Sequence, residues 1–321
     1  MDNNFFITGA DKKKITILVP CFNEVENVQG LYDEIKKIIG CFPKYDFEFL
    51  FMDNSSTDGT DVLLKKIASN DKAVKVIINT RNFGWLRSPY YGLLQSKADA
   101  VVSMAADFQD PPQLISEFIR KWEEGNKLVL GVRNKIQQTG LMVYVRKMYY
   151  YLIRKISDVE QINNFTGFAL YDKEFIDILR NIDEPYPYLR GLICEFGLKR
   201  AEVYFTQPVR KNGKSKTNFY ALYDVAMNGF VNHSKLPLRL ASFIGFSASL
   251  ISFALGVAYL VYKLLFWNRF EMGLAPIIIG LFFFASVQLF FIGVIGEYVG
   301  AIYTQVKKRP LIIEKERINF D

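Results

Sequence analysis

Short, mainly apolar runs alternate with longer amphipathic stretches through the first 134 residues of the chain. The runs are rich in Val, Ile and Phe, and they predict strands at residues 14–20, 47–52, 74–78, 100–106 and 128–132. The amphipathic stretches predict helices at residues 25–39, 60–68, 88–96 and 113–124. Because strands and helices alternate, we predict a parallel sheet with helices on both faces, which is an α/β fold.

The hydrophobic pattern changes in the last third of the chain. Residues 240–262 and 273–296 contain no charged side chain, and each stretch is long enough to cross about 30 Å of hydrocarbon. A pair of buried core helices is the alternative, but such helices are shorter and keep one polar face. We therefore predict a domain at 1–235, a two-helix transmembrane region at 236–306, and a cytoplasmic tail at 307–321.

Charged residues beside the two spans predict their orientation. The outer flanks carry Lys235, Arg239, Lys307, Lys308 and Arg309, whereas the loop carries Lys263 and Arg269, offset by Glu271. This bias favours both flanks on the cytoplasmic side. Residues 1–14 are polar and lack the apolar core of a signal peptide. We expect a multi-pass protein of the inner or plasma membrane whose first domain is cytoplasmic.

Composition narrows the function classes. The net charge of +7 suits an anionic membrane surface or anionic substrates. Nucleic acid is a poor candidate partner, because no basic repeat or base-reading motif accompanies the charge. Cys21, Cys41 and Cys194 form no CxxC pair and are expected to be reduced, packed thiols. The single His233 precedes the first span, where an interfacial or capping role is expected.

Oxygen ligands follow the fourth predicted strand, at Asp107, Gln109 and Asp110, and Pro111 and Pro112 come next. Prolines cannot extend a central strand, so the chain leaves the sheet here. Ligands of open α/β sheets bind just beyond the carboxyl ends of the strands. Hard oxygen donors at that place suit Mg²⁺ or Mn²⁺ held together with substrate phosphates. The alternative for Asp110 is a helix N-cap followed by a first-turn proline.

Polar side chains also follow the other predicted strands. Asn23 and Glu24 follow the first strand, Asp53 the second and Asn82 the third. On the strand-end rule, these side chains and Asp107 face one crevice. No GxGxxG pattern follows the first strand, which disfavours a dinucleotide site.

Four motifs in this order carry a resemblance to a known family. They are VPCFNE at residues 19–24, MDNSSTDG at 52–59, NTRNFG at 79–84 and DFQDPP at 107–112. Together they resemble the family-2 glycosyltransferases, which have the GT-A (Rossmann-like) nucleotide-sugar-binding fold. The closer resemblance is to the polyprenyl-phosphate glycosyltransferases, which include dolichyl-phosphate mannose synthase and bactoprenol glucosyltransferases. It covers nearly the whole chain, including both predicted spans.

The resemblance implies a donor site for a UDP-sugar. The residues expected to hold its uridine part are Pro20, Asn23, Glu24 and Asp53. Asn82 and Gly84 are expected beneath the nucleotide, where Gly84 permits close backbone approach. Plain turn chemistry is the alternative for Asp53 and Asp58, and it fits Asp58 better.

The metal site departs from the family pattern. The resemblance makes Asp107 and Gln109 ligands of Mg²⁺ or Mn²⁺, but Ala105 stands where the family has its first carboxylate. One fewer charged ligand weakens metal affinity. A diphosphate supplies further oxygens, so we expect the metal to bind together with the nucleotide.

A second departure lies at residues 163–172. Gly167 stands in the place of a family aspartate and Ala169 in that of an arginine. This loss favours either a changed sugar preference or reduced activity. It is compatible with transfer, because a lipid monophosphate is largely dianionic at neutral pH and needs no general base.

The resemblance also implies an acceptor site. Arg133 and Arg146 match positions that hold the acceptor phosphate, and Arg210, Lys214 and Lys216 match a mobile basic loop that closes over the site. A solvated surface charge is the alternative for each. Residues 141–156 and 219–230 have the composition of membrane-interface helices, with ordinary core packing as the alternative.

We therefore predict transfer of a hexose from a UDP-sugar to polyprenyl (undecaprenyl) phosphate, with inversion. Asp107, Arg133, Arg146 and Arg210 are the predicted catalytic residues. One alternative is a processive polysaccharide synthase. The other is a catalytically weak, nucleotide-sugar-binding membrane protein that regulates a partner, which Ala105 and Gly167 favour. The resemblance suggests a homotetramer, and the choice of sugar stays open.

Overall fold

The structure is a computed structural model that describes residues 12–134, 162, 164–185, 187–208, 236–266 and 274–320. The chain forms two compact units. One comprises Met1–Tyr150, Val159–Thr217 and Lys308–Asp321, and the other comprises Tyr151–Asp158 and Asn218–Lys307. The stretches predicted as interfacial helices, residues 141–156 and 219–230, lie outside the described residues.

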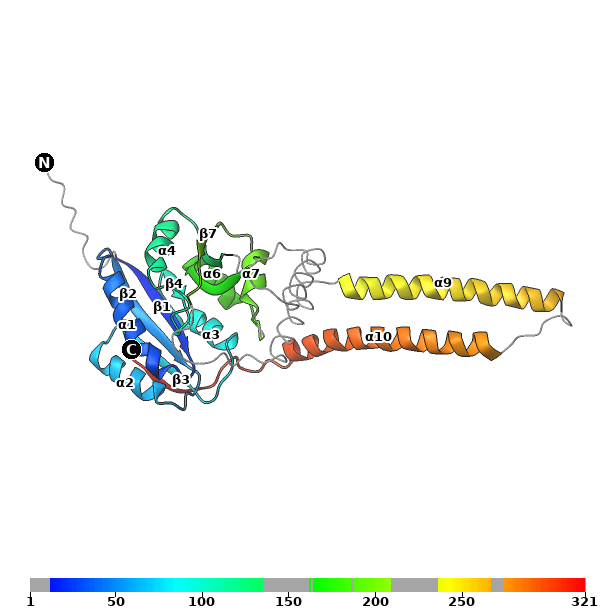
Figure 1. Cartoon of the computed structure of the whole chain (residues 1–321), viewed down its shortest axis with the longest axis horizontal. Helices are drawn as coiled ribbons and strands as arrows, with labels where there is room; N and C mark the ends of the chain where they lie inside the picture. The colour runs from blue at the N-terminus through cyan, green and yellow to red at the C-terminus, as the bar shows by residue number, and fades with distance from the viewer. Residues whose placement is uncertain are drawn as a thin grey trace. The chain divides into compact units, whose positions relative to one another are not determined.

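An eight-stranded sheet forms the centre of the first unit (Figure 1), in the order β7-β5-β6-β4-β1-β2-β3-β8. Its strands are β1 (Lys13–Cys21), β2 (Tyr45–Asp53), β3 (Val74–Asn79), β4 (Ala100–Ser103), β5 (Leu128–Arg133), β6 (Phe165–Asp172), β7 (Arg200–Phe205) and β8 (Glu314–Ile318). The described helices of this unit are α1 (Val25–Ile39), α2 (Thr60–Asn70), α3 (Arg87–Gln95), α4 (Leu114–Glu123), α6 (Lys173–Asn181) and α7 (Leu189–Glu195).

The predicted parallel arrangement is confirmed for the first four strands. β1 pairs in parallel with β2 and with β4, and β2 pairs in parallel with β3. The sheet as a whole is mixed, because β6 is antiparallel to both β4 and β5. Hydrophobic periodicity locates a strand but carries no information about its direction, which depends on the connection that precedes it.

Both faces of the sheet are buried. Along β1, Ile15, Ile17 and Val19 belong to one hydrophobic cluster, whereas Leu18 belongs to another. Successive side chains of a strand point to opposite faces, so the two clusters lie on the two sides of the sheet. Burial on both faces explains the near-continuous apolar runs of the sequence. On one face α3 packs closely, since a Cβ added at Gly92 would lie 2.5 Å from Leu18 Cδ1.

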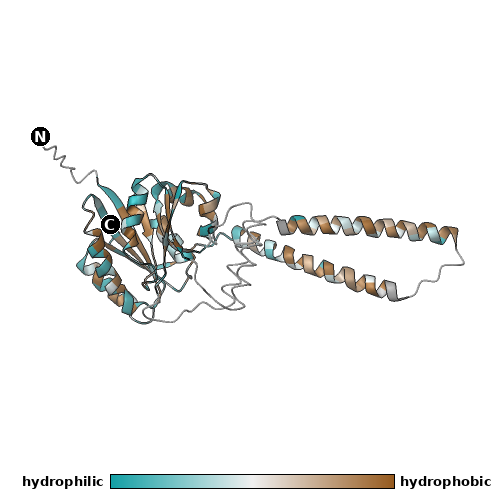
Figure 2. Ribbon diagram, turned by 45° about the horizontal axis from the view of Figure 1, so that its top comes forward, coloured by the Kyte–Doolittle hydropathy of each residue, from teal (hydrophilic) through white to brown (hydrophobic). Residues whose placement is uncertain are grey.

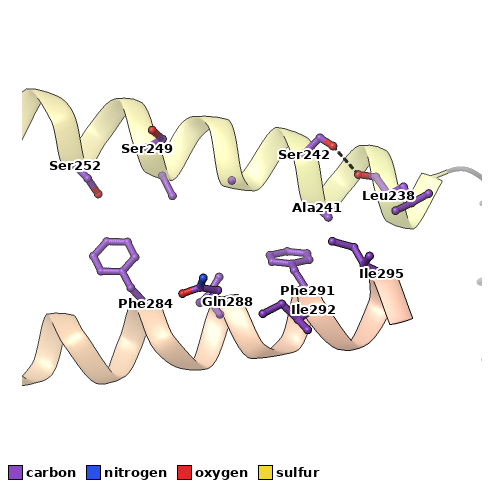
Figure 3. A pocket seen from close by; sticks show the side chains of 13 residues that line it. Leu238, Ala241, Ser242, Ser249, Ser252, Phe284, Gln288, Phe291, Ile292 and Ile295 are labelled. Atoms are coloured by element: carbon purple, nitrogen blue, oxygen red, sulfur yellow. Dashed lines mark hydrogen bonds between the residues drawn. The ribbon is translucent and has the colours of Figure 1, made fainter. Parts of the chain in front are cut away.

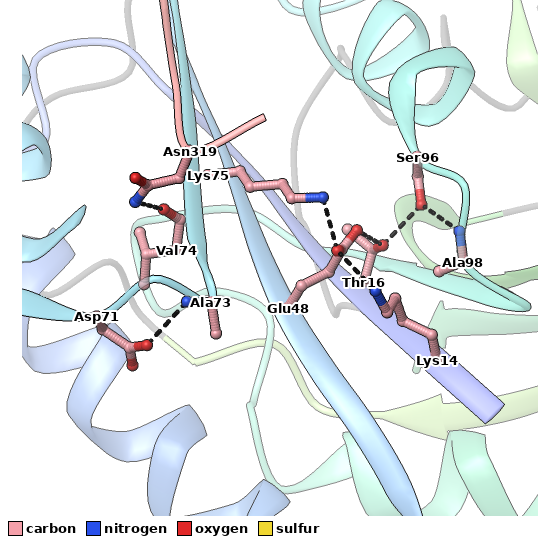
Figure 4. A network of polar contacts seen from close by, with 10 residues as sticks. All are labelled: Lys14, Thr16, Glu48, Asp71, Ala73, Val74, Lys75, Ser96, Ala98 and Asn319. Atoms are coloured by element: carbon pink, nitrogen blue, oxygen red, sulfur yellow. Dashed lines mark hydrogen bonds and ion pairs between the residues drawn. The ribbon is translucent and has the colours of Figure 1, made fainter. Parts of the chain in front are cut away.

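The buried carboxylate of Glu48 links the N-terminal parts of β1, β2 and β3 (Figure 4). Glu48 of β2 accepts from Thr16 Oγ1 of β1 at 2.8 Å and pairs with Lys75 Nζ of β3 at 2.8 Å. Thr16 Oγ1 is also 2.6 Å from Ser96 Oγ, just after α3. A buried carboxylate is tolerated only when it is paired. The network therefore links the beginnings of the strands, away from the ends that carry the candidate site.

The C-terminal residues, which the sequence analysis treats as a tail, contribute a strand. β8 pairs antiparallel with β3. Glu316 forms an ion pair with Lys65 of α2 at 2.5 Å, and Asn319 Nδ2 donates to the carbonyls of Ala68 and Val74, each at 2.8 Å. Without β8 the edge of β3 would expose unpaired backbone groups. Four of the five residues of β8 are charged, so hydrophobic periodicity gives no signal for this strand.

The second unit contains two long apolar helices, α9 (Leu236–Leu265) and α10 (Leu274–Val306). Within them, Leu238–Leu265 and Ile279–Val306 are long and apolar enough to cross a membrane. In Figure 2 both helices are coloured mainly brown along their length. The second helix continues past Gly296, the predicted end of the span, because the single charge of Glu297 does not end a helix.

A groove with some polar lining runs between the two helices (Figure 3). Its volume is about 520 Å³, and its lining includes Ser242, Ser249 and Ser252 of α9 and Gln288 of α10. Ser242 Oγ donates to the Leu238 carbonyl at 3.0 Å, so this hydroxyl is satisfied within its own helix. The remaining lining is mostly small or aromatic.

Candidate active site

Strand pairing brings the predicted site residues to one edge of the sheet. Cys21 at the end of β1 is in register with Asp53 at the end of β2, and Leu18 is in register with Ser103 at the end of β4. The chain segments that follow these parallel strands therefore lie next to one another. The structure confirms the shared edge that the strand-end rule predicts for these segments.

The loop after β1 is tied to the loop after β2. Asn23 Oδ1 accepts from the backbone N–H of Thr57 at 2.8 Å, and the Asn23 backbone N–H donates to Ser56 Oγ at 2.9 Å. Asn23 has a φ of 57°, a left-handed conformation that asparagine tolerates. Pro20 lies in β1 just before this loop and is partly buried. Asn23, which is predicted to bind the nucleotide-sugar, thus lies in a loop that hydrogen bonds join to the loop after β2, and Pro20 lies in the strand just before it.

Asp53 is fully buried at the end of β2. Its Oδ1 accepts from Ser56 Oγ at 2.5 Å and its Oδ2 accepts from the Ser56 backbone N–H at 3.1 Å. Burial raises the pKa of this carboxyl, while the hydrogen bonds from Ser56 act in the opposite direction. Burial, with a smaller effect from Asp53, also raises the pKa of the neighbouring Cys21 thiol, which stays uncharged.

Asp58 has the turn role that its sequence position favours. Its Oδ1 accepts from Thr60 N at 3.0 Å and Thr60 Oγ1 at 2.6 Å, and its Oδ2 accepts from Val25 N at 3.1 Å. Burial works against its charge, but the hydrogen bonds outweigh burial and lower the pKa of Asp58. The Glu24 backbone N–H donates to Thr60 Oγ1 at 2.9 Å. These contacts join the beginnings of α1 and α2.

The loop after β3 lies at the same edge of the sheet as the loops after β1 and β2. Asn82 Oδ1 accepts from the Gly84 backbone N–H at 2.8 Å, and Gly84 has a φ of 91°, which only glycine adopts easily. Beneath them, Asn79 Nδ2 donates to Asn54 Oδ1 at 2.9 Å. Trp85 follows with about half of its surface exposed.

The loop after β4 carries the predicted metal ligands. Asp107 is buried, with 9% of its surface exposed, and its Oδ1 accepts from the Gln109 backbone N–H at 3.2 Å. Asp110 Oδ2 accepts from the Ala105 backbone N–H at 2.8 Å. α4 begins at Leu114 after Gln113, so the alternative of Asp110 as a helix N-cap is wrong. Asp110 instead closes the loop that presents Asp107.

Asp110 also links this loop to the end of β5. Burial raises the pKa of Asp110 to about 6, and the nearby negative charge of Asp107 adds to the effect. The Ala105 hydrogen bond and the positive charge of Arg133 oppose it. Electrostatic contact of one carboxyl with both residues places Asp107, Asp110 and Arg133 in one neighbourhood.

Two strands on the other side of the site hold Arg133. The Arg133 backbone N–H donates to Asn164 O at 3.2 Å, just before β6, and its Nη1 donates to Gln207 Oε1 at 2.5 Å, just after β7. Gly167 in β6 has a φ of 101°, and a Cβ there would meet open space. Ala169 is fully buried. Thr166, at the start of β6, contributes a further hydrogen bond to Asp110.

Several predicted site residues have no described position. Arg146, Arg210, Lys214 and Lys216 lie outside the described residues, so their roles stay predictions. The residues that the structure does bring to the shared edge are Pro20, Asn23, Glu24, Asp53, Asn82, Gly84, Asp107, Gln109 and Arg133.

The side-chain oxygens of Asp107 and Gln109 are suitable ligands for a hard divalent metal ion that binds together with phosphate. Asp107 offers a carboxylate and Gln109 an amide oxygen, which are ligand types of Mg²⁺ and Mn²⁺. Across the described residues, no group of three or more His, Cys, Asp or Glu side chains gathers in metal-binding geometry.

The site lies on a mixed α/β sheet, at the carboxyl ends of its parallel strands, which is where open α/β sheets bind ligands. Residues 16–179 match the model of Glycosyl transferase family 2, and the chain belongs to this family, with its GT-A nucleotide-sugar-binding fold. It is a glycosyltransferase.

Relatives match along almost the whole chain. The SfII prophage-derived bactoprenol glucosyl transferase of Shigella flexneri is 32% identical over 94% of this chain and 98% of its own. The uncharacterized glycosyltransferase YkcC of Bacillus subtilis is 32% identical over 93% of this chain and 92% of its own. A crystal structure of mannosyl-3-phosphoglycerate synthase from Rubrobacter xylanophilus aligns with 67% of this chain and 71% of its own, at 17% identity and a TM-score of 0.48.

Two polar partners at this edge were not predicted from the sequence, Ser56, which holds Asp53, and Gln207, which holds Arg133. Asp110 was a predicted oxygen donor, but its bond to the Ala105 backbone was not predicted. Ser56 lies within the motif at residues 52–59, which placed it near the site without giving its partner. Gln207 belongs to no motif, and only the pairing of β7 with β5 reveals it.

Asp110 is expected to stabilise the loop rather than α4. The Asp110→Ala variant leaves the Ala105 backbone N–H without its acceptor and should lower the free energy of unfolding by about 1–3 kcal/mol. Asp110→Asn keeps an acceptor oxygen and should lose less. Thermal unfolding of the purified chain in detergent measures both. Equal losses for the two variants would contradict the assigned hydrogen bond.

Proposed function

We propose that this glycosyltransferase moves a hexose from a UDP-sugar to polyprenyl phosphate, most simply undecaprenyl phosphate, and inverts the anomeric carbon. The observation that carries the proposal is the strand pairing that brings the loop of Asp107 and Asp110, after β4, and Arg133, at the end of β5, to one edge of the sheet. Relatives named bactoprenol glucosyl transferases support a lipid acceptor.

The donor half of the site follows from the loops after β1, β2 and β3. We assign the uridine part to Pro20, Asn23, Glu24 and Asp53, and the backbone near Gly84 to close approach of the nucleotide. Asn23 is held by a hydrogen bond from Thr57 of the neighbouring loop, and Asp53 by hydrogen bonds from Ser56 of the loop that follows it. Held side chains lose little conformational entropy when a ligand binds. Both oxygens of Asp53 accept from Ser56, so binding of the base would exchange or share these bonds.

The acceptor half needs positive charge. A phosphate monoester has a second pKa of about 6 and is largely dianionic at neutral pH. Its oxygen attacks the anomeric carbon of the donor without giving up a proton, so no general base is required. Arg133 would position this phosphate through the planar guanidinium, which matches phosphate oxygens bidentately. Arg146, Arg210, Lys214 and Lys216 are proposed to contribute further charge.

The leaving group is a nucleoside diphosphate, whose growing negative charge must be stabilised. We assign Asp107 and Gln109 to a Mg²⁺ or Mn²⁺ ion, which when bound neutralises diphosphate oxygens. Asp110 keeps the loop that carries both ligands in place through Ala105. Because Ala105 supplies no carboxylate, the ion would bind only weakly without nucleotide.

The two apolar helices are proposed to span the membrane and to bring the chain back to the same side. The chain leaves the first unit before α9 and belongs to it again after α10, where β8 pairs with β3. An even number of crossings satisfies this connection, and the basic residues Lys307, Lys308 and Arg309 favour the cytoplasmic side.

Transfer is tested directly with labelled donors. The purified chain, incubated with undecaprenyl phosphate and labelled UDP-glucose, UDP-galactose or UDP-N-acetylglucosamine, should give a lipid-extractable product that mild acid cleaves. Arg133→Ala should raise the KM for the lipid about 10- to 100-fold, because a charge-assisted contact is lost. Arg120→Ala, on the exposed surface of α4, is the matched control.

The other outcomes of this assay identify the alternatives. A growing polymer would favour a processive synthase. Binding of UDP-sugar without any turnover would favour a regulatory protein, in agreement with the changes at Ala105 and Gly167. Either result would refute the proposed transfer.

Sugar transfer is expected to require the metal ion, which should bind together with the nucleotide. Excess chelator should abolish transfer, and added Mg²⁺ or Mn²⁺ should restore it. Asp107→Asn should raise the metal concentration needed for half-maximal activity by at least about 10-fold, because the one charged ligand becomes neutral. Undiminished activity in excess chelator would rule out the metal assignment.

Membrane topology is checked with thiol labelling. Cys41 is an exposed thiol of the first unit. In a Cys194→Ser background, a membrane-impermeant maleimide should label Cys41 and Lys315→Cys only when the cytoplasmic face is accessible. Asn268→Cys, between the two helices, should be labelled only from the opposite face. Labelling of all three from one face would contradict two crossings.

A further inference from the structure

Arg133 and Gln207 meet at the ends of two paired strands. β5 and β7 are parallel, and Arg133 is in register with Phe205. The next residue, Asn134, donates from its backbone N–H to Phe205 O at 2.8 Å and from its Nδ2 to Thr206 Oγ1 at 3.2 Å. These hydrogen bonds continue the pairing of β5 with β7 to within one residue of Gln207. The 2.5 Å contact from Arg133 Nη1 to Gln207 Oε1 is therefore set by backbone pairing.

The acceptor in this contact is a neutral amide. A guanidinium has several N–H donors in a fixed plane, so one acceptor is enough to orient the whole group. A carboxylate in the same position would orient it equally well but would also cancel its positive charge. An amide orients the guanidinium and keeps the charge, which is the combination that a site for an anionic ligand needs.

The surroundings make the orientation important. Arg133 interacts electrostatically with Asp110, whose side chain is almost completely buried beside Asp107. A long flexible side chain near these carboxylates can turn toward them. Gln207 holds the guanidinium from the β7 side, on a different strand from the one that carries the acidic loop.

We propose that Gln207 is a positioning residue that orients the Arg133 guanidinium toward the phosphate monoester of the acceptor while preserving its charge. This inference rests on the proposed function of the same site.

Two substitutions of similar size separate orientation from packing. Gln207→Met removes the acceptor atom, and Gln207→Glu keeps the shape and the acceptor but adds a negative charge. The KM for undecaprenyl phosphate should rise about 3- to 10-fold for Gln207→Met, the value of one hydrogen bond. It should rise further for Gln207→Glu, and the KM for the UDP-sugar should change little in both.

A purely structural role predicts the opposite order, with the isosteric Gln207→Glu close to wild type. That order, or equal changes in the KM values for donor and acceptor, would overturn the proposal. Arg120→Ala, on the exposed surface of α4, is the control, and its KM values should stay unchanged. In an Arg133→Ala background, Gln207→Met should not raise the KM for the lipid further, because the group that Gln207 orients is already absent.

Binding of a soluble short-chain isoprenyl monophosphate to the full-length chain distinguishes this proposal from the proposed function. If the wild type binds the monophosphate but transfers no sugar, the transfer proposal fails, and the same order of Gln207 variants in Kd still supports the positioning role. If the wild type transfers sugar but the Gln207 variants bind the monophosphate with the same Kd as the wild type, only the positioning role fails. If the wild type neither binds nor transfers, both fail.

Discussion

The candidate site depends on the parallel pairing of β1 with β2 on one side and with β4 on the other. This pairing sets Cys21 beside Asp53 and Leu18 beside Ser103, so the polar loops that follow begin at one edge of the sheet. A slip of one residue would turn every side chain of a strand to the opposite face. Both faces are packed with apolar side chains, so such a slip would bury the wrong residues on both sides, and the register is strongly determined.

The loops at this edge are braced by hydrogen bonds that involve the site residues themselves. Ser56 holds Asp53, Thr57 donates to Asn23, and Asp110 holds the Ala105 backbone. Such bracing keeps ligand-binding groups close to their working geometry before a ligand arrives. Position 105 carries alanine, whose side chain offers no metal ligand, yet its backbone N–H still anchors the loop through Asp110.

β8 returns the chain to the first unit after the two long apolar helices. It covers the edge of β3 and is held by Glu316 and Asn319 to α2 and to the first residue of β3. A short charged strand protects an edge that would otherwise pair with other chains.

The sequence by itself determined the strands and helices of the first 134 residues, the two long apolar helices, the family and the donor-side motifs. These features are local, since periodicity and short motifs are properties of neighbouring residues. Only the tertiary structure decided the antiparallel direction of β6, the strand at 314–318, the loop role of Asp110 and the contact of Gln207 with Arg133. Each of these depends on pairing between segments far apart in the chain, and no local pattern specifies which distant segment becomes the partner.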